Sequence, residues 1–368
     1  IIDGKLHAQN LLKKLKPFGV KYFEKFGRKP SLAVILLGDN PASQIYVKNK
    51  IRISRDNNIK STEILFPNDI SENKLLDKII ELNKNNSIDG ILVQLPLPKH
   101  ISEKIIINTI DPEKDVDGFH PKNFGNLLMG NSNLVPCTPL GCIYMLKNEL
   151  TNLNGKHAVI IGRSNIVGKP MASLLLSSNC TVTVTHSKTK NLDDICKRAD
   201  ILVAAIGRPA MINENYIKEN AIVIDVGINR VENNNHKLSQ KKYTLVGDVD
   251  YDRVIDKVSK ITPVPGGVGP MTIACLMHNT LKAAFLRKKE NFISIIEGVW
   301  YMDWYNVLLF ISLLLVVLIL AWGLITMARG GEYNKSKSNM LMRYRIIFQA
   351  IAILIFVCLL LYKRSTNG

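Results

Sequence analysis

Short apolar runs alternate with polar stretches of helical pattern along most of the chain. Residues 31–37 (SLAVILL) form an apolar run that ends at a turn signal, GDNP at 38–41. Residues 42–57 then have a helical pattern, and residues 91–93 form a second apolar run after the turn at 89–90. This alternation predicts an α/β fold in which helices cover both faces of a parallel sheet.

The same alternation begins again at residue 156. Strands are predicted at 157–161, 181–185, 201–205 and 221–226, with helices at 166–178 and 192–198. Strands and helices in this order are typical of a Rossmann-type dinucleotide-binding domain. The stretch 111–139 is rich in Pro, Gly, Asn and Asp and is expected to be mostly loop at a domain junction. We therefore predict two domains, residues 1–118 completed by a helix at 271–288, and residues 119–270.

The chain changes character towards its C-terminal end. Residues 307–327 are uncharged and rich in Leu, Ile and Val, and at 1.5 Å per residue they span roughly 30 Å, the thickness of a bilayer core. Residues 346–362 form a shorter apolar segment that contains Gln349. We predict a two-helix transmembrane hairpin within residues 302–368, rather than two buried core helices. Residues 291–301 are then a linker or a read-through product.

Composition makes some functions improbable. The formal net charge is +17, but the Lys residues are scattered among Asn and Ile without a basic stripe, interleaved aromatic residues or zinc-ligand spacing. Nucleic-acid binding and a metal site are therefore not expected. The six cysteines form no CxxC pair, and reduced, buried thiols in a cytoplasmic protein are the simplest account. The chain opens at Ile1 rather than Met, so we expect its natural start to lie upstream.

A glycine-containing turn follows the predicted strand at 157–161. Residues 162–170 (GRSNIVGKP) would bring backbone N–H groups and a helix N-terminus towards a phosphate, although such a turn alone is a generic feature of α/β proteins. Arg163 is placed where a guanidinium could reach a phosphate. Ser187 and Lys188 stand at the end of the next strand, where an acidic residue would hold a free ribose 2′-hydroxyl. This chemistry favours NADP over NAD.

A second group of polar residues belongs to the first domain. Tyr46 and Lys50 lie one helical turn apart, so an aromatic ring and an amine could face one ligand. Gln94 follows the strand at 91–93, and α/β proteins carry their sites at the carboxyl ends of strands. The loop at 115–119 adds two carboxylates. The spacing alone favours a simpler interpretation, namely a surface Lys beside a half-buried Tyr, a Gln that satisfies loop backbone, and a plain turn.

Five motifs occur together and in order: Tyr46-x-x-x-Lys50, DGILVQLPLP at 89–98, KDVDGF at 114–119, GRSNIVGKP at 162–170 and PVPGGVGPMT at 263–272. In this combination the chain resembles the bacterial bifunctional methylenetetrahydrofolate dehydrogenase/methenyltetrahydrofolate cyclohydrolase family over residues 1–290. The resemblance implies a two-domain enzyme that oxidises 5,10-methylenetetrahydrofolate with NADP and hydrolyses the 5,10-methenyl product to 10-formyltetrahydrofolate. It also implies a cytoplasmic homodimer formed through the second domain.

Carried over residue by residue, the resemblance assigns roles to both groups. Tyr46 stacks on the folate, Lys50 is the catalytic amine of the cyclohydrolase step, and Gln94 hydrogen-bonds that amine and keeps it uncharged. Asp117 anchors the pterin ring. The remaining substrate contacts are Val93, Leu95, Gly266, Gly267, Pro270 and Thr272, the last four in a loop that closes over both ligands. The dinucleotide is lined by Gly162, Arg163, Ser164 and Ile228, together with Ser187.

Residues 302–368 resemble a second family, the hypoxia-induced-domain proteins, which are two-helix membrane proteins associated with respiratory complexes. The likeness includes Arg-x-Arg-x-x-x-Gln at 343–349, although Asn339 departs from the family pattern. A generic membrane hairpin is the plainer alternative. The loop between the two apolar segments carries five basic residues against the single Glu332, and the positive-inside rule then places this loop in the cytoplasm and the folate enzyme outside.

That topology conflicts with a cytoplasmic folate enzyme. Our hypothesis is that two neighbouring reading frames have been joined between residues 291 and 302, and the rival is an enzyme tethered to the inner membrane in spite of the charge rule. A different alternative for the whole chain is a respiratory-complex-associated membrane protein with a non-catalytic folate- or nucleotide-binding module. The intact set of Tyr46, Lys50, Gln94 and Asp117 argues against it.

Overall fold

The computed structural model describes residues 1–131, 133–232, 243–290 and 292, which belong to one compact unit. The predicted hairpin helices at 307–327 and 346–362 lie outside these residues. Within the described ranges, no helix combines the length and the apolar character that crossing a bilayer requires.

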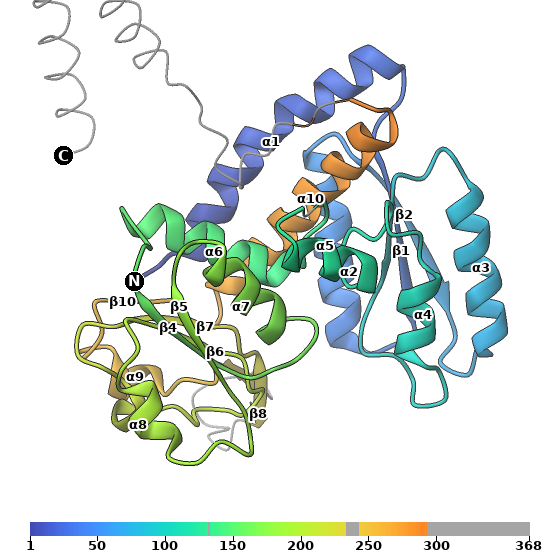
Figure 1. Ribbon diagram of the computed structural model, residues 1–368. Coiled ribbons are helices and arrows are strands. Elements are labelled where there is room, and N and C mark those ends of the chain that lie inside the picture. The colour runs from blue at the N-terminus through green and yellow to red at the C-terminus, as the bar shows by residue number, and fades with distance from the viewer. Residues whose placement is uncertain (132, 233–242, 291, 293–368) are drawn as a thin grey trace, which may run out of the picture. The chain divides into compact units, whose positions relative to one another are not determined.

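A three-stranded parallel sheet forms the centre of the first half of the chain (Figure 1). Its strands are, in spatial order, β2 (Lys60–Phe66), β1 (Ser31–Leu37) and β3 (Gly90–Val93). One face is covered by α3 (Glu72–Lys84) and α4 (Glu103–Thr109), and the other by α2 (Pro41–Asp56) and α10 (Val268–Arg287). The predicted sheet with helices on both faces is confirmed.

The sequence of β1 explains its central position. All its side chains are buried, with Leu32 and Val34 in the apolar cluster on the α10 side and Ala33 and Ile35 in the cluster on the α3 side. Successive side chains of a strand point to opposite faces of the sheet. An uninterrupted apolar run therefore fits a strand that is covered on both faces.

The second half contains a five-stranded parallel sheet in the order β10-β7-β6-β4-β5 (Figure 1). Its strands are β4 (His157–Ile161), β5 (Thr181–Thr185), β6 (Ile201–Ala204), β7 (Ile222–Asp225) and β10 (Lys260–Ile261). The chain runs from β4 outward to β5 and then returns to the other side of β4 to form β6. This reversal marks the ligand crevice of Rossmann-type sheets, so the predicted Rossmann-type order is confirmed.

Three long helices pack together, because α10 contacts both α1 (Gly4–Phe26) and α6 (Cys137–Glu149). The remaining elements are α5 (Pro121–Leu128), α7 (Gly168–Leu176), α8 (Leu192–Cys196), the 3₁₀ turn η1 (Glu214–Tyr216), α9 (Tyr251–Val254), and the antiparallel pair β8 (Asn229–Glu232) and β9 (Tyr243–Val246). α10 is buried around nearly its whole circumference because apolar residues occupy all its sides.

The local structure differs from the prediction in two places. Residues 111–139 are mostly loop, as predicted, but α5 forms within them and α6 begins at Cys137. Pro121 lies in the first turn of α5, where its missing N–H is tolerated, and Leu127 packs into the core. α10 begins three residues earlier than predicted for the same reason, because Pro270 falls in its first turn. The prediction of reduced, buried cysteines is confirmed for the five in the described part.

An aromatic cluster lies between α1 and α10 and continues past the end of α10. The ring centroids of Tyr22 and Phe285 are 5.2 Å apart. The Phe292 ring lies 5.2 Å from Phe18, 5.7 Å from Phe285 and 5.3 Å from His278. The segment that follows α10 therefore belongs to the folded unit at least as far as Phe292.

Phe292→Ala should lower the free energy of unfolding by about 2 kcal/mol, less than for a fully buried ring because Phe292 is only partly buried. Phe23→Ala is a matched control, since Phe23 lies on the exposed side of α1. Thermal unfolding of the full chain measures both variants. Equal and small changes in Tm would show that Phe292 does not stabilise the unit.

Candidate active site

The first group of predicted site residues meets at the carboxyl edge of the three-stranded sheet. Tyr46 and Lys50 lie on α2, which follows β1, and Gln94 directly follows β3. β1 and β3 are neighbouring parallel strands, so their carboxyl ends lie at the same edge. The Lys50 Nζ donates a hydrogen bond of 3.0 Å to Gln94 Oε1 and lies 5.0 Å from the centroid of the Tyr46 ring.

Gln94 is held in one orientation by its own contacts. Its backbone N–H donates to Ile35 O at 2.9 Å, and its side-chain Nε2 donates to Leu95 O at 2.8 Å. The Oε1 atom is thereby left to accept from Lys50. Because a carbonyl oxygen accepts from an amine in either protonation state, this contact positions Lys50 and does not by itself keep it uncharged.

Burial changes the proton affinity of both Lys50 and Asp117. Lys50 is 5% exposed, and its loss of hydration lowers its pKa below the ordinary 10.5, an effect that the nearby Asp117 opposes. Burial raises the pKa of Asp117 to about 6, and here the attraction to Lys50 works against the rise. An amine that binds its proton less tightly, beside a carboxylate that binds one more tightly, is suited to moving a proton near neutral pH.

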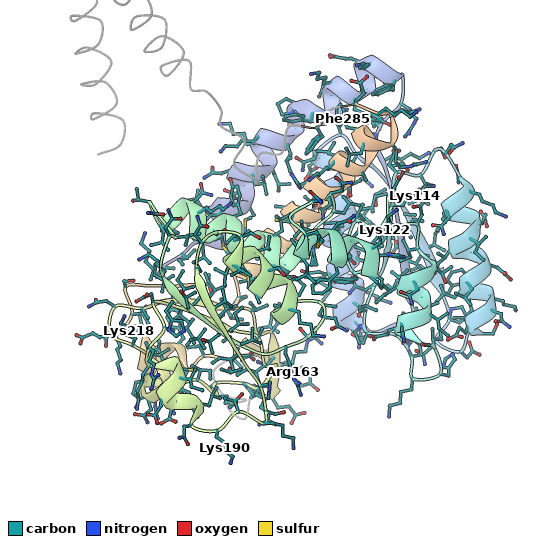
Figure 2. All side chains as sticks on the ribbon, in the orientation of Figure 1. Lys114, Lys122, Arg163, Lys190, Lys218 and Phe285 are labelled. Atoms are coloured by element: carbon teal, nitrogen blue, oxygen red, sulfur yellow. The ribbon has the colours of Figure 1, made fainter. Side chains whose placement is uncertain are left out.

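The loop that carries Asp117 is fixed by the two charged residues before it. Lys114 (Figure 2) is fully buried, and its ammonium donates to three backbone carbonyls at the C-terminal end of α3, where the helix dipole favours a cation. The Asp115 carboxylate accepts from the His120 N–H at 2.7 Å and from the Asn123 amide at 2.9 Å. Asp115 therefore builds the loop, while Asp117 is the carboxylate that interacts with Lys50.

α10 and a small cavity complete this half of the site. Burial raises the pKa of Tyr46, so its phenol stays protonated, and a side-chain hydrogen bond links it to Thr272 in the first turns of α10. Val93 and Leu95 line a small cavity together with Asp117 and apolar side chains of α4. The structure thus brings seven of the predicted substrate and catalytic residues to the same sheet edge: Tyr46, Lys50, Val93, Gln94, Leu95, Asp117 and Thr272.

The glycine turn of the second half lies at the reversal point of the five-stranded sheet. Gly162 follows β4 with a φ of +125°, and a Cβ there would lie 2.2 Å from the carbonyl oxygen of Ala205, which follows β6. Gly168 opens α7, and a Cβ there would lie 2.1 Å from Gly162 O. Since neither position has space for a side chain, the backbone of the turn can approach a ligand closely at the N-terminus of α7.

Arg163 and Ser187 are exposed at the carboxyl ends of the neighbouring strands β4 and β5. In Figure 2, Arg163 lies on the side of its sheet that is nearer to the first half of the chain. Ser164 has a structural contact instead, because its Oγ accepts from the N–H groups of Val167 at 3.2 Å and Gly168 at 3.3 Å. These two bonds hold residues 164–168 in a turn, and α7 begins only at Gly168, two residues later than predicted.

The glycine-rich loop before α10 lies beside the second sheet. Ile228 is 57% exposed, and its Cδ1 lies 3.9 Å from the position of a Cβ at Gly269. Gly266 has a φ of +112°, and a Cβ at Gly267 would lie 2.6 Å from Pro263 O. The loop is therefore a closely packed turn that touches the dinucleotide half through Ile228 and continues into the helix that contacts Tyr46.

Two buried carboxylates of the second half were missed by the sequence analysis. Asp248 accepts hydrogen bonds from all three N–H groups of residues 206–208, which follow β6. Asp225, at the end of β7, accepts from the N–H groups of Gly227 and Val249, and burial raises its pKa to about 6. Together they fix three segments at the ligand edge of the sheet. The one signal in the sequence was the glycine at position 227. In the structure a Cβ there would lie 2.3 Å from the Asp248 carboxylate, so only glycine fits beside it.

A Rossmann-type half and a half with an amine–carboxylate site, joined by one loop and one helix, define a two-domain, dinucleotide-dependent α/β enzyme. Residues 2–117 match the catalytic domain of the tetrahydrofolate dehydrogenase/cyclohydrolase family, and residues 136–288 match its NAD(P)-binding domain. The chain belongs to this family. Residues 306–359 match a separate family, described as hypoxia induced protein conserved region.

Known relatives agree with the chain over the same part. Bifunctional protein FolD 1 of Acinetobacter baylyi is 54% identical over 291 residues, which are 79% of this chain and 96% of the relative. The crystal structure of the bifunctional enzyme FolD from Campylobacter jejuni has a TM-score of 0.73 and 47% identity, over 78% of this chain and 98% of that one. FolD of Trypanosoma brucei, solved with NADP cofactor and inhibitor, has a TM-score of 0.74 and 36% identity, over 79% and 98%. Both predicted family resemblances are confirmed.

Proposed function

We propose that residues 1–290 oxidise 5,10-methylenetetrahydrofolate to 5,10-methenyltetrahydrofolate with NADP and then hydrolyse the product to 10-formyltetrahydrofolate. The observation that carries this proposal is the buried Lys50 amine, hydrogen-bonded to Gln94 and close to Tyr46 and Asp117. The family and the solved dehydrogenase/cyclohydrolase of Campylobacter jejuni support it. A non-catalytic binding module is not supported, because Tyr46, Lys50, Gln94 and Asp117 are all present and lie together in one site.

The dehydrogenase step requires close and aligned approach of the two ligands. NADP, when bound, supplies the hydride acceptor for the folate methylene group. Tyr46 stacks on the folate ring and Asp117 accepts hydrogen bonds from the pterin. The glycine-rich loop at 265–272 lies between the two halves of the site and holds the ligands in contact, so the barrier is lowered mainly by positioning.

The cyclohydrolase step requires a group that takes up and returns a proton. The methenyl product is a cation, and water attacks its one-carbon bridge. Neutral Lys50 accepts the proton that the water loses as its oxygen bonds to that carbon. The resulting ammonium returns the proton to the ring nitrogen as the carbon–nitrogen bond breaks, and the hydroxyl on the one-carbon unit loses its own proton to solvent, which yields the 10-formyl product. Burial brings the pKa of Lys50 towards the working pH, and Asp117 stabilises the transient ammonium.

The residues of the second half fit NADP. Gly162 and Gly168, at the two ends of the turn, have no space for a side chain, and the turn lies at the N-terminus of α7, which suits a pyrophosphate. Arg163 and Ser187 are exposed at adjacent strand ends, and neither strand ends in an acid that would hold a free ribose 2′-hydroxyl. We propose that these two residues receive the 2′-phosphate and that Ile228 packs beside the dinucleotide.

Residues 1–118, completed by the helix at 271–288, form the folate half, and residues 119–270 form the dinucleotide half. The matched family ranges support a boundary near residue 118, and the packing of α10 against α1 and α2 supports its assignment to the folate half. Val93, Leu95 and the loop from Gly266 to Thr272 complete the folate contacts. The enzyme part is cytoplasmic and forms a homodimer through the dinucleotide half, as the family resemblance implies.

For residues 302–368 we propose a two-helix membrane hairpin of the hypoxia-induced type. The family match at 306–359 supports this assignment. The contacts of Phe292 with Phe18 and Phe285 support assigning the chain up to residue 292 to the enzyme, so a junction between the two parts falls after that point. The hairpin either tethers the enzyme to the inner membrane or is the product of a separate reading frame.

Lys50→Met should abolish cyclohydrolase activity while folate binding is largely retained, because the side chain keeps its size and loses its amine. Lys48→Met is a matched control, since Lys48 is exposed on the same helix. Full hydrolysis by Lys50→Met would remove Lys50 from the mechanism.

In the unmodified enzyme, the cyclohydrolase rate should rise with pH as Lys50 loses its proton. The midpoint of that rise should lie below the lysine reference pKa of about 10.4.

Arg163→Ala should raise the KM for NADP by about tenfold or more and change the KM for NAD much less, because only NADP carries the 2′-phosphate that a guanidinium can hold. Arg198→Ala is the control, since Arg198 is exposed near the opposite, amino end of β6. Steady-state kinetics with both dinucleotides give the comparison. An equal rise for NADP and NAD would overturn the phosphate assignment.

Fractionation of native cells with mass spectrometry should find a soluble product that ends before Met302 and a separate small membrane protein. We expect this outcome because it removes the conflict between the basic hairpin loop and a cytoplasmic enzyme. A single full-length product in the membrane fraction, identified by a peptide that spans residues 291–303, would establish a tethered enzyme instead.

A further inference from the structure

The carbonyl group of Val116 lies in the backbone between the two loop carboxylates and receives two side-chain donors. The Asn279 amide of α10 donates to it at 2.8 Å, and the Cys137 thiol at the start of α6 donates to it at 3.2 Å. Asn279 and Cys137 are 1% and 2% exposed. The peptide that leads into Asp117 is therefore bound from two helices that are far from it in sequence.

The same Asn279 amide also binds the segment before α6. Its Nδ2 donates to Val135 O at 2.8 Å, so one amide group holds two backbone carbonyls. An independent observation shows that these two segments are in close contact. A Cβ at Gly118, which has a φ of +75°, would lie 2.5 Å from the Val135 carbonyl carbon and 2.5 Å from the Pro136 nitrogen. Asn279 thus fixes a closely packed pair of loops, and Asp117 lies in one of them.

α10 has other contacts with the amine side of the site. Thr272, near its start, is hydrogen-bonded to Tyr46, and Met277 accepts a hydrogen bond of 3.3 Å from Ser54, whose hydroxyl is shared with Lys50 O at 2.8 Å. The helix that holds the Asp117 loop therefore also contacts the helix that carries Lys50. α10 therefore links the segment that carries the amine to the segment that carries the carboxylate.

We propose that Asn279 is a positioning residue for the folate site, which sets the place of Asp117 relative to Lys50 through the Val116 and Val135 carbonyls. This inference rests on the proposed function. Asn279 touches neither substrate nor dinucleotide, so its removal acts on folate steps and leaves the second half unchanged. Leu at this position has a similar volume but no donor, so Val135 O loses the amide and Val116 O keeps only the weaker Cys137 thiol donor. The loop is then free to shift, and a small displacement of a reacting group strongly lowers the reaction rate.

The test compares Asn279→Leu with Thr280→Val in the full chain. Thr280 is the next residue of α10, is fully buried, and donates only to Leu276 O within the helix, at 2.8 Å. Its substitution measures the cost of losing a buried hydrogen bond that does not reach the loop. We expect Asn279→Leu to raise the KM for methylenetetrahydrofolate by about tenfold or more, with the dissociation constant for NADP unchanged within about twofold. Thr280→Val should leave both constants near those of the unmodified enzyme.

A second pair of variants keeps the proposal testable if Asn279→Leu does not fold. Cys137→Ala removes the other donor to Val116 O, whereas Cys137→Ser retains one. We expect a smaller rise in the folate KM for Cys137→Ala and its recovery in Cys137→Ser. Equal folate KM values for Asn279→Leu and Thr280→Val, or a matching loss of NADP affinity, would overturn the positioning role. An inactive unmodified enzyme would overturn the proposed function as well.

Discussion

Keeping the Lys50 amine away from water is the constraint on which the rest of this structure depends. A buried ionisable group is tolerated only where its surroundings supply hydrogen-bonding and charged partners. Gln94 and Asp117 supply them from two different segments, one after β3 and one in the loop before α5. Both segments must be held rigidly, because a displaced acceptor would leave the amine unsatisfied. The parallel sheet meets this demand by ending its strands at one edge, and α10 meets it by binding the Asp117 loop through Asn279.

Both halves of the molecule use the same means to shape a loop beside a ligand. Buried carboxylates accept several N–H groups at once. In the folate half Asp115 accepts from a backbone N–H and a side-chain amide, and in the dinucleotide half Asp225 and Asp248 each accept from several backbone N–H groups. A loop cannot satisfy its N–H groups through regular strand or helix pairing, so a side chain has to accept from them. Glycines such as Gly162 then allow the backbone itself to come close to a neighbouring segment. Carboxylates and glycines therefore determine the ligand edges, while apolar runs determine the sheets.

The fold was largely predictable because its strands are continuous apolar runs between turn signals, and a run such as 31–37 fits few other structures. The spacing of Tyr46 and Lys50 placed both on one face of a helix, and the family resemblance then identified them. Spacing alone could not separate the parts of Asp115 and Asp117, because the two are the same residue type two positions apart, and only the family resemblance assigned Asp117 to the folate. The contacts formed in the folded chain distinguish them. Asp248 was missed for a related reason, since the N–H groups it accepts from lie about forty residues earlier in the chain.

The ring of Phe292 gives the molecule a mechanical property. It packs against α1 through Phe18 and against α10 through Phe285 and His278. Any pulling force applied through the chain beyond residue 292 would load this ring before it reached a backbone hydrogen bond of α10. The load would then pass into the helix that holds the Asp117 loop through Asn279. A chain anchored at its far end would thus feel tension in its folate site, whereas an enzyme released after residue 292 would not.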